Sequence, residues 1–245
     1  MKRQIPNLLT LVNLFCGCLA TVSVLYENYD VAFWLFIIAG AFDFSDGLAA
    51  RALNVSSPVG KELDSLADMV SFGIFPGAIF FQLLDESDLG RDVFPSLGGD
   101  TYAYESLALL GFLFTLAACY RLAKFNLDTR QSENFIGLAT PAATAGAVGL
   151  MCLLSSGEEI LAGFAQNSIV LIPTIILLAY LMISEVPFFA FKLKSTGWRG
   201  NEIRYIFAAV SILALIVFGK VAFAPLVGLY ILLNLGMMLT GRPKD

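Results

Sequence analysis

Four aspartates lie close together in an otherwise strongly apolar stretch of the sequence: Asp43, Asp46, Asp64 and Asp68. If the segments around them are helical, each pair shares one helix face, because residues three or four apart point the same way. Carboxylates without histidine or cysteine partners suit hard divalent cations such as Mg²⁺ or Mn²⁺ rather than zinc. Two such pairs could hold two ions, and paired ions clamp phosphoryl groups during displacement reactions.

Small residues and one arginine accompany these aspartates. Gly47 and Ala50 share the face of the first pair, and Gly60 precedes the second pair by one helical turn, so a ligand could approach the backbone there. Arg51 would offer a planar guanidinium that binds phosphate in bidentate fashion. The combination predicts a diphosphate site. The alternatives are that the aspartates pair with Arg51 or Lys61, and that the small residues serve helix packing.

The composition places these helices in a membrane. The chain has 245 residues, of which 58% are hydrophobic and 14% charged, and its mean hydropathy is +0.77. Apolar runs of membrane-spanning length recur throughout, so we expect an all-α polytopic membrane protein forming a single domain over residues 1–245. Eight helices are predicted, over residues 8–26, 31–53, 59–83, 103–124, 139–156, 166–190, 203–219 and 221–240.

The distribution of basic residues predicts the orientation of these helices. With the N-terminus inside, every lysine and arginine except Arg91 and Lys220 falls on cytoplasmic segments. The positive-inside rule and the even number of helices then place both termini in the cytoplasm. The aspartates would lie in the cytoplasmic half of the bilayer and face the cytoplasm. The acidic loop over residues 84–102 would form a solvated cap on the other side.

Histidine is absent from the chain. This excludes a Ser-His-Asp triad, a histidine metal ligand and an imidazole base. Nothing in the sequence suggests a nucleic-acid partner.

The motif D-x2-D-G-x2-A-R-x8-G-x3-D-x3-D, carried here from Asp43 to Asp68, resembles the signature of the CDP-alcohol phosphatidyltransferases. The resemblance implies a bundle with six core transmembrane helices, often a homodimer, that transfers a phosphatidyl group from a CDP-linked lipid to an alcohol and releases CMP. It further implies that the four aspartates hold two divalent cations and that Asp68 is the general base. Gly47, Ala50 and Arg51 would then line the site of the cytidine nucleotide. Asp46, Gly60 and Asn13 complete the predicted CDP and diphosphate site.

Further stretches resemble the bacterial phosphatidylserine synthases within this family. They are the opening segment 5–17, Arg121-Leu-Ala-Lys-Phe-Asn126, Phe135-Ile-Gly-Leu-Ala-Thr-Pro-Ala-Ala143 and Pro187-Phe-Phe-Ala-Phe-Lys192. In that subfamily's pattern an arginine stands where this chain has Lys124, and a proline where it has Ala139. Losing the guanidinium weakens the case for Lys124 as a carboxylate ligand.

The resemblance makes Arg121, Lys124 and Asn126 candidates for binding serine, and the same residues could instead recognise the diphosphate. Positive-inside anchoring alone could also explain the two cations, which lie at the cytoplasmic end of the fourth predicted helix. Glu185 could meet the serine ammonium group or pair with Arg204 or Lys192. On the first helix, Asn7, Thr10 and Asn13 could reach the nucleotide or bond neighbouring helices.

The sequence therefore predicts an enzyme that transfers the phosphatidyl group of CDP-diacylglycerol to L-serine with Mg²⁺ or Mn²⁺. A sister transferase acting on glycerol 3-phosphate or inositol phosphate is the nearest alternative. A cation transporter using the same carboxylates is the alternative from another class.

Overall fold

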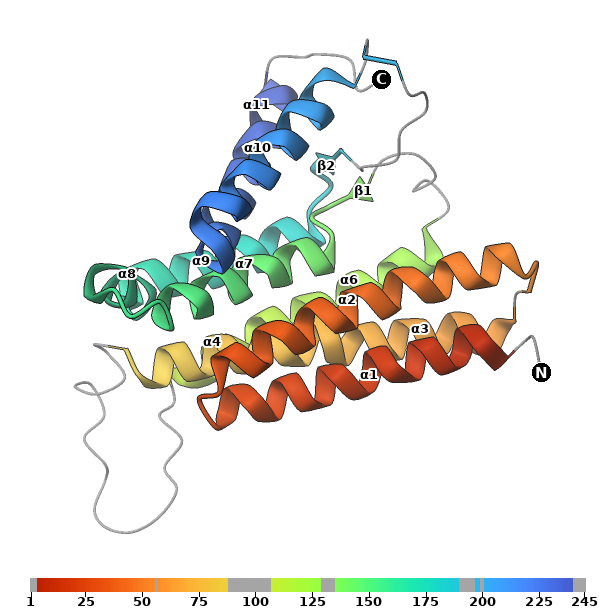
Figure 1. Ribbon diagram of the computed structural model, residues 1–245, viewed down its shortest axis with the longest axis horizontal. Helices are drawn as coiled ribbons and strands as arrows, with labels where there is room; N and C mark the ends of the chain where they lie inside the picture. Colours follow the sequence, from red (N-terminus) through yellow and green to blue (C-terminus); the bar gives the residue numbers. More distant parts are fainter. Residues whose placement is uncertain are drawn as a thin grey trace.

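The fold is known from a computed structural model, which describes residues 4–55, 57–87, 107–128, 135–189, 197–198 and 201–239. Helices run up and down along the long axis of the molecule, as Figure 1 shows. The first three are α1 (Gln4–Leu25), α2 (Tyr29–Ala52) and α3 (Pro58–Met69). A π-helical turn, η1 (Val70–Ile74), joins α3 to α4 (Phe75–Asp85), so that one continuous helical segment crosses the bundle.

The second half of the bundle starts with a short 3-10 turn, η2 (Ala108–Gly111), and α6 (Phe112–Leu127). It continues with α7 (Thr140–Leu154), α8 (Glu159–Ala165) and α9 (Ser168–Ile183). Two-residue strands, β1 (Phe135–Ile136) and β2 (Pro187–Phe188), pair antiparallel and join the chain before α7 to the chain after α9.

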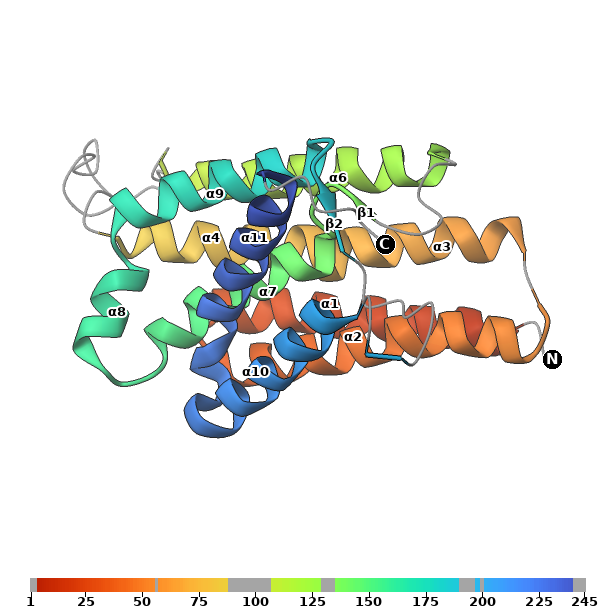
Figure 2. The ribbon, with the colours of Figure 1, turned by 90° about the horizontal axis from the view of Figure 1, so that it is seen from above.

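The last two helices, α10 (Glu202–Phe218) and α11 (Phe223–Leu239), cross the others at a steep angle (Figures 1 and 2). A 3-10 turn, η3 (Gly219–Ala222), separates them at the predicted division near Lys220. Gly219 begins that turn with φ of +60°, a backbone conformation that glycine adopts without steric cost.

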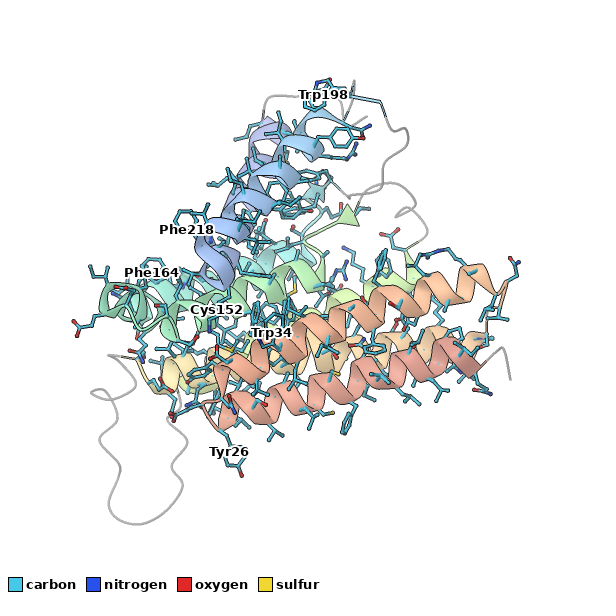
Figure 3. All side chains as sticks on the ribbon, in the orientation of Figure 1. Tyr26, Trp34, Cys152, Phe164, Trp198 and Phe218 are labelled. Carbon is cyan, nitrogen blue, oxygen red and sulfur yellow. The ribbon has the colours of Figure 1, made fainter. Side chains whose placement is uncertain are left out.

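All eight predicted segments contain a helix, and the all-α prediction is confirmed apart from the two short strands. In the described part of the chain, length and composition qualify five helical segments as membrane spans, or six if the bent pair α8 and α9 forms one. The predicted cap over 84–102 lies mostly outside the described residues. Large aromatic side chains such as Tyr26, Trp34 and Phe218 are exposed on the surface (Figure 3), as expected of a protein surrounded by lipid.

The core is aromatic and lies where the segment α3–η1–α4 passes between its neighbours. Phe72, Phe75, Phe80 and Phe114 are almost completely buried there. Glycines allow the close packing: a Cβ on Gly111 of η2 would overlap the backbone of Phe80 and Phe81 in α4. The central segment is thus held firmly, and it is the segment that carries two of the four aspartates.

Candidate active site

Two helices that meet at a short connection present the four aspartates. Asp43 and Asp46 lie on the last turns of α2, and Asp64 and Asp68 lie on α3. Ser57 fixes the start of α3, since its hydroxyl accepts a hydrogen bond of 2.9 Å from the Gly60 amide and Pro58 follows in the first turn.

The structure brings three of these carboxylates together. Asp43, Asp64 and Asp68 each offer an oxygen, and these oxygens lie within 4.8 Å of one another. Asp46 is 7% exposed and lies beside this group, where its carboxylate accepts a hydrogen bond of 2.5 Å from the Thr10 hydroxyl of α1. The ion pairs Lys124–Glu185 and Lys220–Asp30 include none of the four aspartates.

This arrangement fits a divalent cation. Like-charged carboxylates held this close, with no lysine or arginine paired to them among the described residues, are stabilised when a cation lies between them. The oxygen donors suit a hard ion. The aspartate cluster could therefore bind metal, with Asp43, Asp64 and Asp68 as the ligands that the geometry groups and Asp46 next to them.

A pocket of about 270 Å³ opens beside the cluster, between α1, α2 and the start of α3. Five of the predicted CDP-site and metal residues line it: Asp46, Gly47, Ala50, Gly60 and Asp64. Asn7 and Thr10 of α1 line it too, and the Thr10 hydroxyl also bonds Asp46 of the neighbouring helix. The pocket also includes Pro6, Val55, Ser57 and Lys61, which the sequence did not single out as site residues.

Two predicted members of the CDP site lie outside the lining of this pocket. Arg51 is exposed at the end of α2, and its guanidinium lies over the face of Gly47, where a Cβ would be 3.5 Å from Nη1. Asn13 is fully buried, one helical turn deeper than Thr10, and its amide donates to Asp68 at 3.5 Å. Its Oδ1 atom has no hydrogen-bond partner among the described residues.

Arg121 reaches Asp68 from the other side, on α6. The guanidinium is buried, interacts electrostatically with Asp68, donates 2.8 Å to the Thr140 hydroxyl and lies 5.2 Å from the centre of the Phe125 ring. Its Nε has no hydrogen-bond partner within the described ranges. A buried cation without a paired carboxylate is costly, so a ligand that pairs with this guanidinium would be stabilising.

The other two candidates for serine binding are differently placed. Lys124 lies 3.9 Å from Glu185. The expected partners of Glu185 were Arg204 and Lys192, and Lys192 lies outside the described residues. The Asn126 amide donates 2.7 Å to the Ser65 hydroxyl, and its backbone carbonyl accepts 3.1 Å from Lys61. These contacts fasten the end of α6 to α3, so the described contacts of Asn126 are interhelical.

Thr140 was not among the predicted site residues, although it lies within the Phe135–Ala143 stretch that resembles the subfamily. It begins α7, is fully buried, and orients the Arg121 guanidinium. The strand pair just before it sets its position: the Gly137 amide donates 2.8 Å to the carbonyl of Val186, and Gly137 has φ of +78°. The Phe135–Ala143 stretch was a visible motif, but only the fold shows that it supports Arg121.

The fold and site define a class: a multi-pass helical membrane protein whose clustered carboxylates adjoin a pocket between helices. Residues 3–180 match the sequence model of the CDP-alcohol phosphatidyltransferases, and the chain belongs to that family. The chain is 35% identical over 206 residues to a Bacillus subtilis protein named CDP-diacylglycerol–serine O-phosphatidyltransferase, covering 80% of this chain and 98% of that one.

Two further relatives extend the comparison. A Helicobacter pylori protein of the same name, from strain 26695, is 31% identical over 189 residues, which cover 76% of this chain and 72% of the relative. The archaetidylserine synthase of Methanothermobacter thermautotrophicus is 29% identical over 142 residues, which cover 57% and 54% of the two chains.

Proposed function

We propose that this protein is a phosphatidylserine synthase, which transfers the phosphatidyl group of CDP-diacylglycerol to the hydroxyl of L-serine and releases CMP. The observation that carries the proposal is that Asp68 lies between two unlike binding regions. On one side is the pocket between α1, α2 and α3, which Asp46 and Asp64 help to line, and on the other is the buried guanidinium of Arg121. The names of the relatives from B. subtilis and H. pylori support serine as the acceptor.

In this proposal the pocket receives the cytidine nucleotide. Gly47, Ala50 and Gly60 have little or no side chain, so the ligand can approach the backbone of the pocket closely. Arg51 at the rim provides a bidentate phosphate donor. Thr10 holds the Asp46 carboxylate in one orientation.

Two divalent cations, Mg²⁺ or Mn²⁺, would be held by Asp43, Asp46, Asp64 and Asp68, and would supply positive charge beside the diphosphate. Arg121 would bind the serine carboxylate through its unpartnered edge and so place the serine hydroxyl near Asp68. Asp68 would accept the hydroxyl proton as the serine oxygen bonds to the phosphatidyl phosphorus. The bond from that phosphorus to the bridging oxygen of the diphosphate breaks, and CMP leaves with the bridging oxygen.

The orientation and assembly belong to the same proposal. We place the protein in a bacterial inner membrane. The segregation of lysine and arginine supports termini on the cytoplasmic side and a site that opens to that side. Family resemblance supports a homodimer with six core helices.

The decisive experiment measures the acceptor. The purified protein in detergent is given CDP-diacylglycerol and Mn²⁺ with labelled L-serine, glycerol 3-phosphate or inositol phosphate in parallel, and CMP and labelled lipid are quantified. Serine-dependent CMP release with labelled phosphatidylserine is expected. CMP release with another acceptor and none with serine would overturn the proposal. A parallel assay with a CDP-linked ether lipid in place of CDP-diacylglycerol tests which lipid donor the protein uses, since one relative is an archaetidylserine synthase.

A further inference from the structure

The helical segment that carries Asp64 and Asp68 changes its winding immediately after the second aspartate. Residues Val70–Ile74 form the π-helical turn η1, after which the α-helix resumes at Phe75. Such a turn adds one residue and rotates everything before it by about 100° relative to everything after it. The direction in which Asp68 points therefore depends on this turn being kept in place.

Three hydroxyl groups attach the turn to three different helices. The Thr115 hydroxyl of α6 donates 2.9 Å to the carbonyl of Gly73, and the Thr144 hydroxyl of α7 lies 3.0 Å from the carbonyl of Phe72. On the third side, Ser71 of the turn donates 3.1 Å to the carbonyl of Asn13 in α1. Asn13 is also the residue whose amide bonds Asp68.

Glycines make room for these contacts. A Cβ on Gly77 would overlap the Thr115 hydroxyl, and a Cβ on Gly17 of α1 would come within 2.8 Å of the Ser71 Cα. Side chains at either glycine would push α6 or α1 away from the turn. The hydroxyls thus bond backbone carbonyls at points where the helices pack closely against the turn. A small shift of the turn would therefore move Asp68.

We infer that Thr115 and Thr144 are positioning residues for Asp68, acting through the π-helical turn. The inference rests on the role of Asp68 in the proposed function. Thr115 gives the cleaner test, because the Thr144 hydroxyl also bonds the carbonyl of Thr140, the residue that orients Arg121. Replacing the Thr115 hydroxyl by a methyl group leaves the volume of the side chain nearly unchanged.

The test compares Thr115→Val and Thr115→Ser with the control Thr174→Val. Thr174 lies on α9, and among the described residues its hydroxyl bonds only within its own helix, to the carbonyl of Val170. Thr115→Val should lower kcat for serine-dependent CMP release roughly tenfold, as removing a residue that orients a catalytic group does, and KM for CDP-diacylglycerol should stay within about twofold. Thr115→Ser should restore kcat, and Thr174→Val should not change it.

A second measurement separates this inference from the proposed function. Binding of Mn²⁺ alone is titrated by electron paramagnetic resonance, and Thr115→Val should weaken it roughly tenfold because Asp68 is one of the grouped carboxylates. If the wild type uses no serine but the valine variant loses Mn²⁺ affinity and the serine variant keeps it, the proposed function fails and the positioning role stands. An unchanged Mn²⁺ affinity and kcat in folded Thr115→Val would overturn the inference, as would equal losses in both Thr115 variants.

Discussion

At one end of the bundle Glu86 accepts hydrogen bonds from three side chains, whereas at the other end Asp43, Asp64 and Asp68 face one another. The donors to Glu86 are Tyr29 at 2.9 Å, Gln82 at 2.8 Å and Gln166 at 3.0 Å. They come from α2, from α4 and from the residue after α8. Close by, Lys220 pairs with Asp30 and lies 3.4 Å from the Ser155 hydroxyl.

The aspartate end has the reverse character. Asn13 donates to Asp68 at the long distance of 3.5 Å, and Thr10 donates to Asp46. Neither the Lys124–Glu185 pair nor the Lys220–Asp30 pair includes any of these four carboxylates. A carboxylate that the fold has supplied with donors stabilises the fold. A cluster of carboxylates with no paired lysine or arginine among the described residues could bind a cation.

The largest effect that this comparison predicts is on catalysis. Asp68→Asn should lower kcat for CMP release by about 10³-fold, within the usual range for removing a general base, while the protein still folds. Glu86→Gln, the matched change at the other end, should leave kcat of the folded enzyme within about twofold. Comparable losses of kcat in the two variants would contradict the division between the ends.

Stability should respond in the opposite sense. In the presence of chelator, Asp43→Asn should raise the midpoint of thermal unfolding, because it removes repulsion on the order of 1 kcal/mol or more between close carboxylates. Glu86→Gln should lower the midpoint, at a cost of about 1–3 kcal/mol, because at least one buried donor loses its acceptor. Both are read from thermal unfolding in detergent. A lower midpoint for Asp43→Asn would mean that this aspartate stabilises the metal-free fold.

Arg121 sharpens the comparison, because it is a buried cation at the aspartate end without an ion pair among the described residues. Arg121→Lys keeps the charge but loses the planar edge. It should therefore raise KM for serine roughly tenfold, with KM for CDP-diacylglycerol within about twofold. Lys124→Met serves as the control, since Lys124 pairs with Glu185. If Arg121→Lys raised KM for serine and KM for CDP-diacylglycerol equally, Arg121 would contribute to packing of the site and not specifically to serine binding.

The sequence predicted those features of the fold that depend on local sequence, and it did not predict those that depend on contacts between helices. Apolar length predicts helices, so the eight segments were visible. The spacing of the aspartates on helix faces predicted that two acidic faces would meet. The π-helical turn after Asp68 was not visible, because it depends on contacts from α1, α6 and α7 rather than on local propensity.

The site shows the same limit. Asn126 was a candidate for serine, but its amide reaches Ser65, a partner 61 residues away along the chain. The support of Arg121 by Thr140 likewise depends on how α6 and α7 pack. Spacing within one helix could be interpreted from the sequence, whereas pairing between helices required the fold.

The smallest predicted effect concerns the ion pair between Lys220 and Asp30. The Asp30 side chain is 72% exposed, so water screens the attraction, and Lys220→Met should cost less than about 1 kcal/mol of stability. It should leave kcat and the Mn²⁺ affinity unchanged, because the pair lies at the end of the bundle away from the aspartates. Thermal unfolding and serine-dependent CMP release check both statements. A change in kcat of more than about twofold would show that the end distant from the aspartates is coupled to the catalytic one through α2 or α7, which Asp30 and Ser155 adjoin.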